Sequence, residues 1–154
     1  ENCVGCGHCI AACPFDAIMA HFDEKGELLD AKVAEYAQAV LAGRPHFHIS
    51  LAMDITPLCD CWLSSDAAVV PDIGMFASFD PVALDLACVE ALQKQPVIAN
   101  SMLGEALARG GQDGAGERVD YIQAIHPHSN WRVTVDHAVK LGIGSDQYEL
   151  IEVD

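Results

Sequence analysis

Four cysteines at fixed intervals stand within the first thirteen residues, and they constrain what this chain can fold into more than any other feature. They are Cys3, Cys6, Cys9 and Cys13, and Pro14 follows the last of them. Bacterial ferredoxins hold a 4Fe-4S cluster with this spacing, because two-residue gaps let successive thiolates converge on one small volume. Gly5 and Gly7 allow the tight turns that such a loop needs. Zinc sites usually use two separated Cys-x-x-Cys pairs, so the spacing predicts a ferredoxin-type 4Fe-4S module.

Two further cysteines, Cys59 and Cys61, leave the identity of the fourth cluster ligand open. In ferredoxins with two clusters, the cysteine before the proline binds the other cluster. If Cys13 turns away in this manner, Cys59 or Cys61 completes the first site; otherwise Cys13 closes it locally. In a third arrangement Cys13, Cys59 and Cys61 form a second metal site with an Asp or His side chain. The plain alternative is that Cys59 and Cys61 are ordinary loop thiols. The candidate metal ligands are Cys3, Cys6, Cys9, Cys13, Cys59 and Cys61.

The chain is strongly acidic, with 23 Asp and Glu against 8 Lys and Arg and a formal net charge of −15. Nucleic-acid binding depends on basic contacts with phosphate, so this balance argues against a nucleic-acid partner. It fits a protein that docks electrostatically on a basic redox partner, although solubility alone accounts for it equally well.

The pattern of apolar residues and cysteines points to a cytoplasmic protein. No apolar run approaches the length of a membrane span, and no secretory leader is present. Seven cysteines in a cluster-type pattern indicate a reducing compartment. Because the chain lacks an initiator Met and begins two residues before Cys3, we expect it to be part of a longer polypeptide.

Strand and helix signals alternate along the rest of the chain. The expected helices begin at Asp30, at Asp80, near Ser101, near Glu117 and near Trp131; the expected strands cover residues 46–53, 67–70 and 148–153, with a hairpin at 21–29. The first helix carries Val33, Tyr36 and Val40 at helical spacing, and the first strand carries Phe47, Ile49 and Leu51 on one face. We therefore expect a mixed α/β fold, with a ferredoxin-type module over residues 1–29 packed with an α/β domain over residues 30–154.

Other candidate sites are weaker. His46 and His48 lie on one strand face and could converge on a metal, but no third ligand is visible and a polar sheet face is the preferred interpretation. The glycine-rich stretch 110–116 lacks the Lys-Ser/Thr ending of a phosphate loop and is interpreted as a connector. Cys88 lies on the apolar face of the helix after Asp80 and is interpreted as core. No Ser/His/Asp set is visible, so no catalytic residue is predicted.

Several short motifs are more particular than the cysteine spacing. They are Ala34-Glu35-Tyr36-Ala37, Asp54-Ile55-Thr56-Pro57-Leu58-Cys59-Asp60-Cys61, Pro71-Asp72-Ile73-Gly74, Asp80-Pro81-Val82-Ala83-Leu84-Asp85, His126-Pro127 and Trp131-Arg132. Together with the cysteines, and in this order, they resemble the C-terminal half of the bacterial and archaeal iron–sulfur proteins called the domain of unknown function 362 family. The resemblance implies a cytoplasmic protein of anaerobes with an α/β fold, an embedded ferredoxin-type module and an N-terminal portion before the cysteines. It implies no particular reaction.

These patterns predict an iron–sulfur protein that carries one 4Fe-4S cluster and transfers single electrons to or from a protein partner. It would be an electron carrier or the electron-relay part of a larger oxidoreductase. The apolar residues Val4, Ile10, Phe15 and Ile18 are expected to limit access of water to the cluster. One alternative is a redox enzyme domain with a second metal site at Cys59 and Cys61. Another is a structural or redox-sensing cluster.

Overall fold

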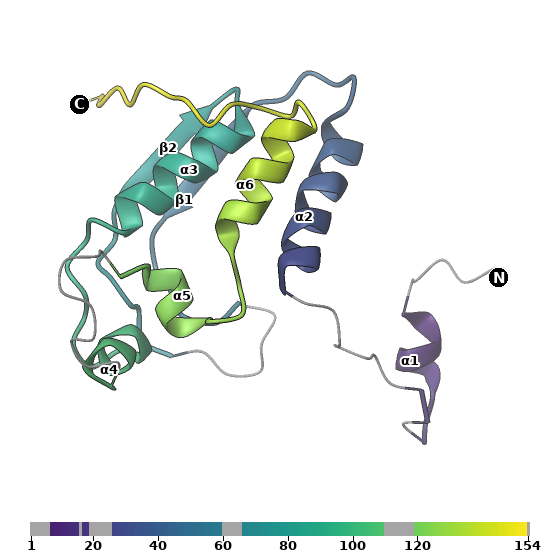
Figure 1. Ribbon diagram of the computed structural model, residues 1–154, viewed down its shortest axis with the longest axis horizontal. Helices are drawn as coiled ribbons and strands as arrows, with labels where there is room; N and C mark the ends of the chain where they lie inside the picture. Colours follow the sequence, from purple (N-terminus) through teal and green to yellow (C-terminus); the bar gives the residue numbers. More distant parts are fainter. Residues whose placement is uncertain (1–6, 16, 19–25, 60–65, 110–118, 154) are drawn as a thin grey trace.

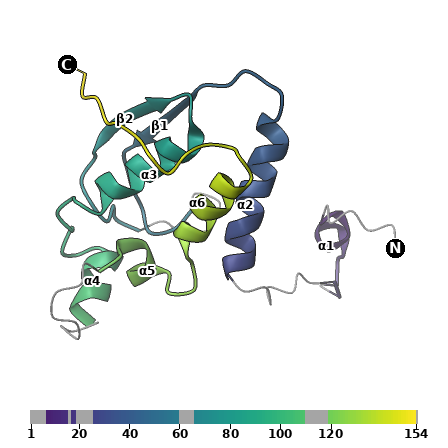
Figure 2. The ribbon, with the colours of Figure 1, turned by 45° about the horizontal axis from the view of Figure 1, so that its top comes forward.

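The computed structural model describes residues 7–15, 17–18, 26–59, 66–109 and 119–153 (Figure 1). The elements are α1 (His8–Ala12), α2 (Gly26–Leu41), β1 (His48–Ala52), β2 (Gly74–Ser78), α3 (Pro81–Leu92), α4 (Met102–Arg109), α5 (Tyr121–Ile125) and α6 (Trp131–Lys140). The predicted mixed α/β fold is confirmed. Helix α3 lies between the two-stranded sheet and α6, and α2 packs on α6 (Figure 2). Helix α1 stands apart, on the side of α2 that faces away from α6 (Figures 1 and 2).

Helices α2 and α6 pack side by side and run in the same direction. Two small residues lie at their contact, since Ala34 and Ala138 are both buried in one cluster with Val82 of α3. Polar contacts hold the pair at both ends. Thr134 donates a hydrogen bond to the Asp30 carbonyl at 2.9 Å, and Gln38 donates one to the Leu141 carbonyl at 2.8 Å. Small side chains at the contact let the two helices approach closely, and the polar contacts then set their register.

The start of α2 differs from the sequence prediction. The helix begins at Gly26, so Asp30 lies inside it rather than at its N-cap, and residues 26–29 are helical rather than part of a hairpin. The Asp30 carboxylate instead accepts a hydrogen bond from the backbone amide of Asn130 at 2.9 Å. This tertiary partner, 100 positions away in the sequence, replaces the local capping role. The remaining hairpin residues lie outside the described ranges.

Helix α3 begins as its sequence predicts. Asp80 is the N-cap, with its side chain accepting from the amides of Val82 and Ala83, and Pro81 follows at the first helical position. The helix is buried on most sides: Val82, Ala83, Leu84, Leu86 and Ala87 are all buried, whereas Cys88 is half-buried. This central position explains why its apolar residues are not confined to one stripe.

The sheet consists of β1 and β2 in antiparallel register, with Ile49 opposite Ala77 and Leu51 opposite Met75. As predicted, Phe47, Ile49 and Leu51 share a face, but this face is exposed. Helix α3 covers the other face, where His48 and Ser50 point toward it. We call the exposed face the outer sheet face; it consists of Phe47, Ile49, Leu51, Met53, Met75, Ala77 and Phe79.

A second core lies around Val69, Val70 and Leu103, which are nearly fully buried. The sequence predicts a strand here, and this prediction is wrong, because residues 66–70 form no strand. Loop residues supply hydrogen-bond partners for this backbone instead. The Val69 amide donates to the Ile55 carbonyl at 2.8 Å, and the Val69 carbonyl accepts from the Ile98 amide at 3.0 Å. Burial without strand pairing is possible because these loop contacts satisfy the polar backbone groups.

The C-terminal half follows its predicted helices but not its predicted strand. Helices α4 and α6 start within one residue of their expected positions, while α5 begins at Tyr121 behind an Asp120 N-cap. Gly142 ends α6 with a φ of 74°, a backbone conformation that glycine adopts readily. Residues 148–153 form no strand, and Leu150, Ile151 and Val153 are exposed. The glycine-rich stretch 110–116 lies outside the described ranges. Among the described helices, none has the length and apolar character needed to span a membrane.

Candidate functional site

Two of the predicted cluster ligands, Cys9 and Cys13, belong to the short helix α1. Gly7 precedes it with a φ of 70°, which a glycine adopts without strain, and its carbonyl accepts from the amides of Ile10 and Ala11. Cys9 lies inside the helix and Cys13 is its C-cap. Because residues four apart lie on the same side of a helix, α1 brings these two cysteines to one side. Both are free thiols, Cys9 exposed and Cys13 half-buried.

The sulfur of Cys13 lies among backbone amides of the chain that follows it. Hydrogen bonds from the amides of Phe15, Ala17 and Ile18 lower the pKa of the Cys13 thiol from its ordinary value of 9.0. A lowered pKa favours the thiolate, which is the form that binds iron. The turn after Pro14 therefore forms an amide cradle around one sulfur.

The apolar residues near these cysteines do not shield them in this structure. Ile10, Phe15 and Ile18 are all exposed, Phe15 to 86%. In the described part of the chain α1 stands apart from the other helices (Figure 1). That these residues limit access of water to a bound cluster therefore stays a prediction. Val4 lies outside the described residues.

The loop that ends at Cys59 is held by contacts from distant parts of the chain. Asp54 adopts a φ of 49°, an uncommon left-handed conformation that Asp tolerates better than most residues. The Asp54 amide donates to the Asp72 carboxylate at 2.8 Å. Farther along, the Pro57 carbonyl lies 2.6 Å from Nε2 of His126. We call residues 54–59 the Cys59 loop; it is positioned from both sides, and Cys59 lies exposed at its end.

The structure does not decide which cysteine completes the predicted metal site. Within the described ranges, no three His, Cys, Asp or Glu side chains lie close enough together to hold a metal ion. Cys3, Cys6 and Cys61 lie outside those ranges. The choice between local closure by Cys13, completion by Cys59 or Cys61, and a second metal site therefore stays a prediction.

His46 and His48 form a hydrogen-bonded pair. Nε2 of His48 lies 2.9 Å from Nδ1 of His46, so one ring donates to the other. On the side toward α3, His48 interacts with Asp85, and Ser50 hydrogen-bonds to Cys88. Desolvation raises the pKa of Asp85, and His48 partly opposes this shift; desolvation also raises the pKa of Cys88. These groups line the inner side of the sheet, as the prediction of a polar sheet face implies.

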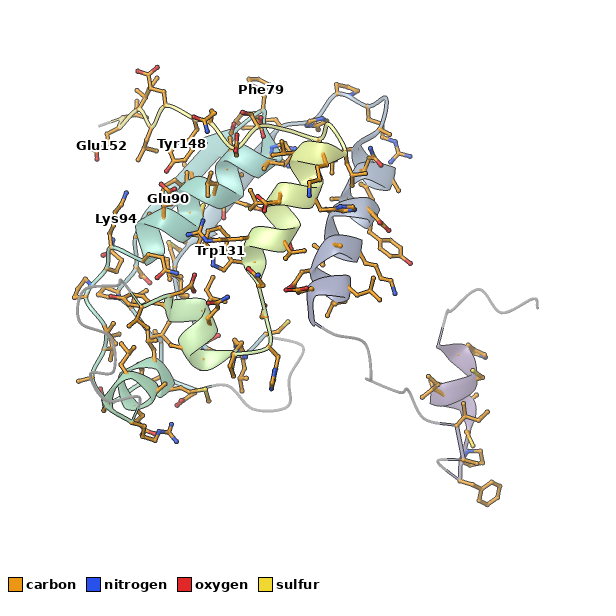
Figure 3. All side chains as sticks on the ribbon, in the orientation of Figure 1. Phe79, Glu90, Lys94, Trp131, Tyr148 and Glu152 are labelled. Carbon is orange, nitrogen blue, oxygen red and sulfur yellow. The ribbon has the colours of Figure 1, made fainter. Side chains whose placement is uncertain are left out.

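A surface pocket of about 370 Å³ lies where the C-terminal half of α3 meets the start of α6. Figure 3 shows Glu90, Lys94 and Trp131 around it. Nε1 of Trp131 donates to Asp120 at 2.7 Å, and the Arg132 guanidinium lies 4.3 Å from the centre of the Trp131 ring. The sequence prediction did not single out this pocket, because its residues come from three segments with no spacing in common.

Comparison with known families decides what this chain belongs to. A family model described as domain of unknown function (DUF362) matches residues 2–90, which is more than half of the chain. The chain belongs to this family. The predicted family is thereby confirmed, and the matched range contains the four cysteines, the Cys59 loop, Asp72 and Asp80. No curated protein and no solved structure matches the chain. The DUF362 description assigns no activity, so the site itself must supply the functional argument.

Asp72 and His126 are the residues whose role the sequence prediction missed. Both occur in motifs that carried the family resemblance, Pro71-Asp72-Ile73-Gly74 and His126-Pro127. The structure shows that each contacts the Cys59 loop, Asp72 through a carboxylate oxygen and His126 through Nε2. Asp72 lies 18 positions from Asp54, and His126 lies 69 positions from Pro57. No local sequence pattern therefore indicates these contacts.

Proposed function

We propose that this DUF362 protein binds a 4Fe-4S cluster through Cys3, Cys6, Cys9 and Cys13 and passes single electrons to or from a protein partner. The spacing of the four cysteines supports this assignment, because it matches that of bacterial ferredoxins. The placement of Cys9 and Cys13 on one side of α1 is compatible with a shared site. When bound, a cluster of this type supplies a one-electron redox couple.

The spacing of the four cysteines carries the proposal, and the amide donors beside the Cys13 sulfur support it. A thiolate that binds iron has excess negative charge, and amide donors stabilise it. In this chain the donors come from Phe15, Ala17 and Ile18, directly after the proline that ends the cysteine motif. Hydrogen bonds to the sulfur atoms are one of the ways in which a protein sets the potential of such a site. The residues present therefore fit the proposed group.

The charge of the chain favours a basic partner. With a formal net charge of −15, its field attracts a positively charged surface and repels other acidic proteins. Such attraction weakens with ionic strength, since the screening length falls to about 8 Å at physiological salt. A reducing cytoplasm is the compartment in which free thiols and a cluster of this kind persist.

The test is anaerobic purification followed by iron and sulfide analysis and electron paramagnetic resonance after reduction. We expect about four iron and four sulfide per chain and a reversible one-electron signal. The variant Cys13→Ser should lose most of the iron. Cys88→Ser is the matched control, since Cys88 lies on α3 and should leave the iron content unchanged. Absence of iron and sulfide from the anaerobic protein would refute the proposal. A cluster that can be reduced only with unfolding of the chain would favour a structural or sensing role.

A second candidate function is a redox enzyme domain with a further site at Cys59, Asp60 and Cys61. The observation that favours it is the positioning of the Cys59 loop by Asp72 and His126. This function predicts that the double variant Cys59→Ser, Cys61→Ser keeps the 4Fe-4S cluster but loses a second bound metal or a catalytic activity. A double variant that loses the cluster itself would instead identify one of these cysteines as its fourth ligand.

A further inference from the structure

The outer sheet face is apolar where the exposed side of a sheet is normally polar. Antiparallel sheets commonly turn apolar residues toward the core and polar residues toward water. Here the inner face is mixed, because Ala52 and Phe76 share it with His48 and Ser50. The outer face is apolar, and Ile49, Leu51 and Met75 are exposed on it. The side chains that the sheet leaves in water are those that would gain most from burial.

The exposed residues form one continuous patch. Ile49 lies opposite Ala77 and Leu51 opposite Met75, and directly opposed side chains in a sheet are in contact. At one end Phe47 and Phe79 pack edge to face, with their ring centres 4.9 Å apart. Figure 3 shows Phe79 at the top edge of the molecule. Monomeric proteins rarely expose an apolar patch larger than a few hundred Å², so this one indicates an interface.

Charge restricts what can cover this patch. Residues 45–53 and 73–79 contain no Asp, Glu, Lys or Arg, in a chain of which 20% of the residues are charged. A basic redox partner is attracted to carboxylates, and the outer sheet face has none. The complementary surface is therefore another uncharged apolar one. A second copy of this chain offers such a surface, and a two-fold axis brings identical patches together.

The size of the patch suits a dimer. Its six large side chains are exposed to between 45% and 75%. Together they expose on the order of 700 Å², close to the roughly 800 Å² that each partner contributes to a stable interface. A second exposed apolar surface, the α2 stripe of Leu29, Val33, Tyr36 and Val40, is interspersed with the charged residues Lys32 and Glu35. It is the less favourable surface for contact between two acidic chains.

We propose that the outer sheet face is an interface between two copies of this chain. The two sheets stack face to face, and Ile49 and Leu51 lie near the centre of the contact. Each copy has a net charge of −15, so long-range repulsion opposes the dimer. Added salt screens this repulsion and should therefore strengthen the dimer, which is opposite to its effect on binding of a basic partner. The proposal does not depend on the cluster.

The experiment is sedimentation analysis of the purified chain over a series of protein and salt concentrations. We expect a dimer whose dissociation constant falls as salt rises. The variant Leu51→Asp places a charge in the patch and should raise the dissociation constant at least about tenfold. Val33→Asp on the α2 stripe is the matched control and should leave it unchanged. Because both positions are exposed, far-ultraviolet circular dichroism should show that each variant is folded.

Three outcomes would overturn this proposal. The first is a chain that stays monomeric at all concentrations and salt levels. The second is a dimer that Val33→Asp disrupts and Leu51→Asp does not. The third is a dimer that weakens as salt rises. The same measurement on Cys13→Ser separates the interface from the proposed cluster, since loss of iron with an unchanged dimer leaves the interface intact.

Discussion

Nε2 of His126 lies 2.6 Å from the carbonyl oxygen of Pro57, although the two residues are 69 positions apart. A carbonyl oxygen only accepts hydrogen bonds, so the imidazole must donate, which both its Nε2-protonated neutral form and its cation can do. This contact joins the Cys59 loop to the end of α5. With the contact between Asp72 and Asp54, it determines where Cys59 is presented.

Replacement of His126 tests whether this contact positions the Cys59 loop. The variant His126→Phe keeps a ring but removes the donor, leaving the carbonyl of the buried Pro57 without its partner. We expect a loss of stability of about 1–3 kcal/mol and faster hydrogen exchange at the amides of Ile55, Thr56 and Leu58. His128→Phe is the control, because His128 is exposed and the same substitution there should change neither quantity. Unchanged exchange in His126→Phe would contradict a positioning role.

Asp80 joins the start of α3 to the turn after α6. One carboxylate oxygen accepts from Val82 and Ala83, and the other accepts from the Ser145 amide at 2.8 Å. Asp80→Ala should cost about 2 kcal/mol in the free energy of unfolding, measured in urea. Ser145→Ala, which retains the backbone amide, should cost far less.

A substitution at Gly144 also tests the contact that joins Asp80 to the turn after α6. A Cβ at this position would lie 2.1 Å from Oδ1 of Asp80, so Gly144→Ala must displace the carboxylate. We expect a destabilisation of about 1–3 kcal/mol in the wild-type background. In the Asp80→Ala background most of this cost should disappear, because the two changes act on one contact. Full additivity of the two costs would show that Gly144 acts elsewhere.

The hydroxyl of Tyr148 should ionise at an unusually high pH. Its hydroxyl donates to Glu90 at 2.5 Å, and this hydrogen bond raises the pKa of Tyr148 from 10.0 to about 12. A pKa higher in the folded chain than in the unfolded chain adds stability below pH 10, and this stability is lost as the pH rises from 10 to about 12. Ultraviolet titration should find a tyrosine that ionises at this high pH, and Glu90→Gln should abolish that high-pH step. Tyr36→Phe should leave that step in place.

The pKa of Asp120 shifts in the opposite direction, so its effect on stability falls at acid pH. Desolvation raises its pKa, but hydrogen bonds from Trp131 and from the amides of Gln123 and Ile122 outweigh this and hold the pKa below its ordinary 3.8. A pKa lowered by folding adds stability above that value, and the stability is lost as the pH falls through the folded pKa. Trp131→Phe should therefore raise the pKa of Asp120, measured by carboxyl resonances in nuclear magnetic resonance, and reduce the acid sensitivity of unfolding. An unchanged pKa would mean that the indole is not the donor that matters.

Local signals predicted much of the secondary structure. Asp80 followed by Pro81 marks a helix start through groups within three residues of each other, and the structure confirms it. The face shared by Phe47, Ile49 and Leu51 follows from the alternation of a strand. The predictions failed where a distant partner replaced a local one. Asp30 caps no helix because Asn130 binds it, and Val69 is buried without a strand because Ile55 and Ile98 satisfy its backbone.

The features of the candidate site also fall into two groups, those that the sequence determines and those that depend on the tertiary structure. By itself the sequence determined the cysteine spacing, the acidic charge and the family, because each depends on residue identity and order alone. Only the tertiary structure decided that Asp72 and His126 hold the Cys59 loop and that the apolar side of the sheet faces outward. Alternation shows which side chains share a face, but which face α3 covers depends on packing between segments far apart in the chain.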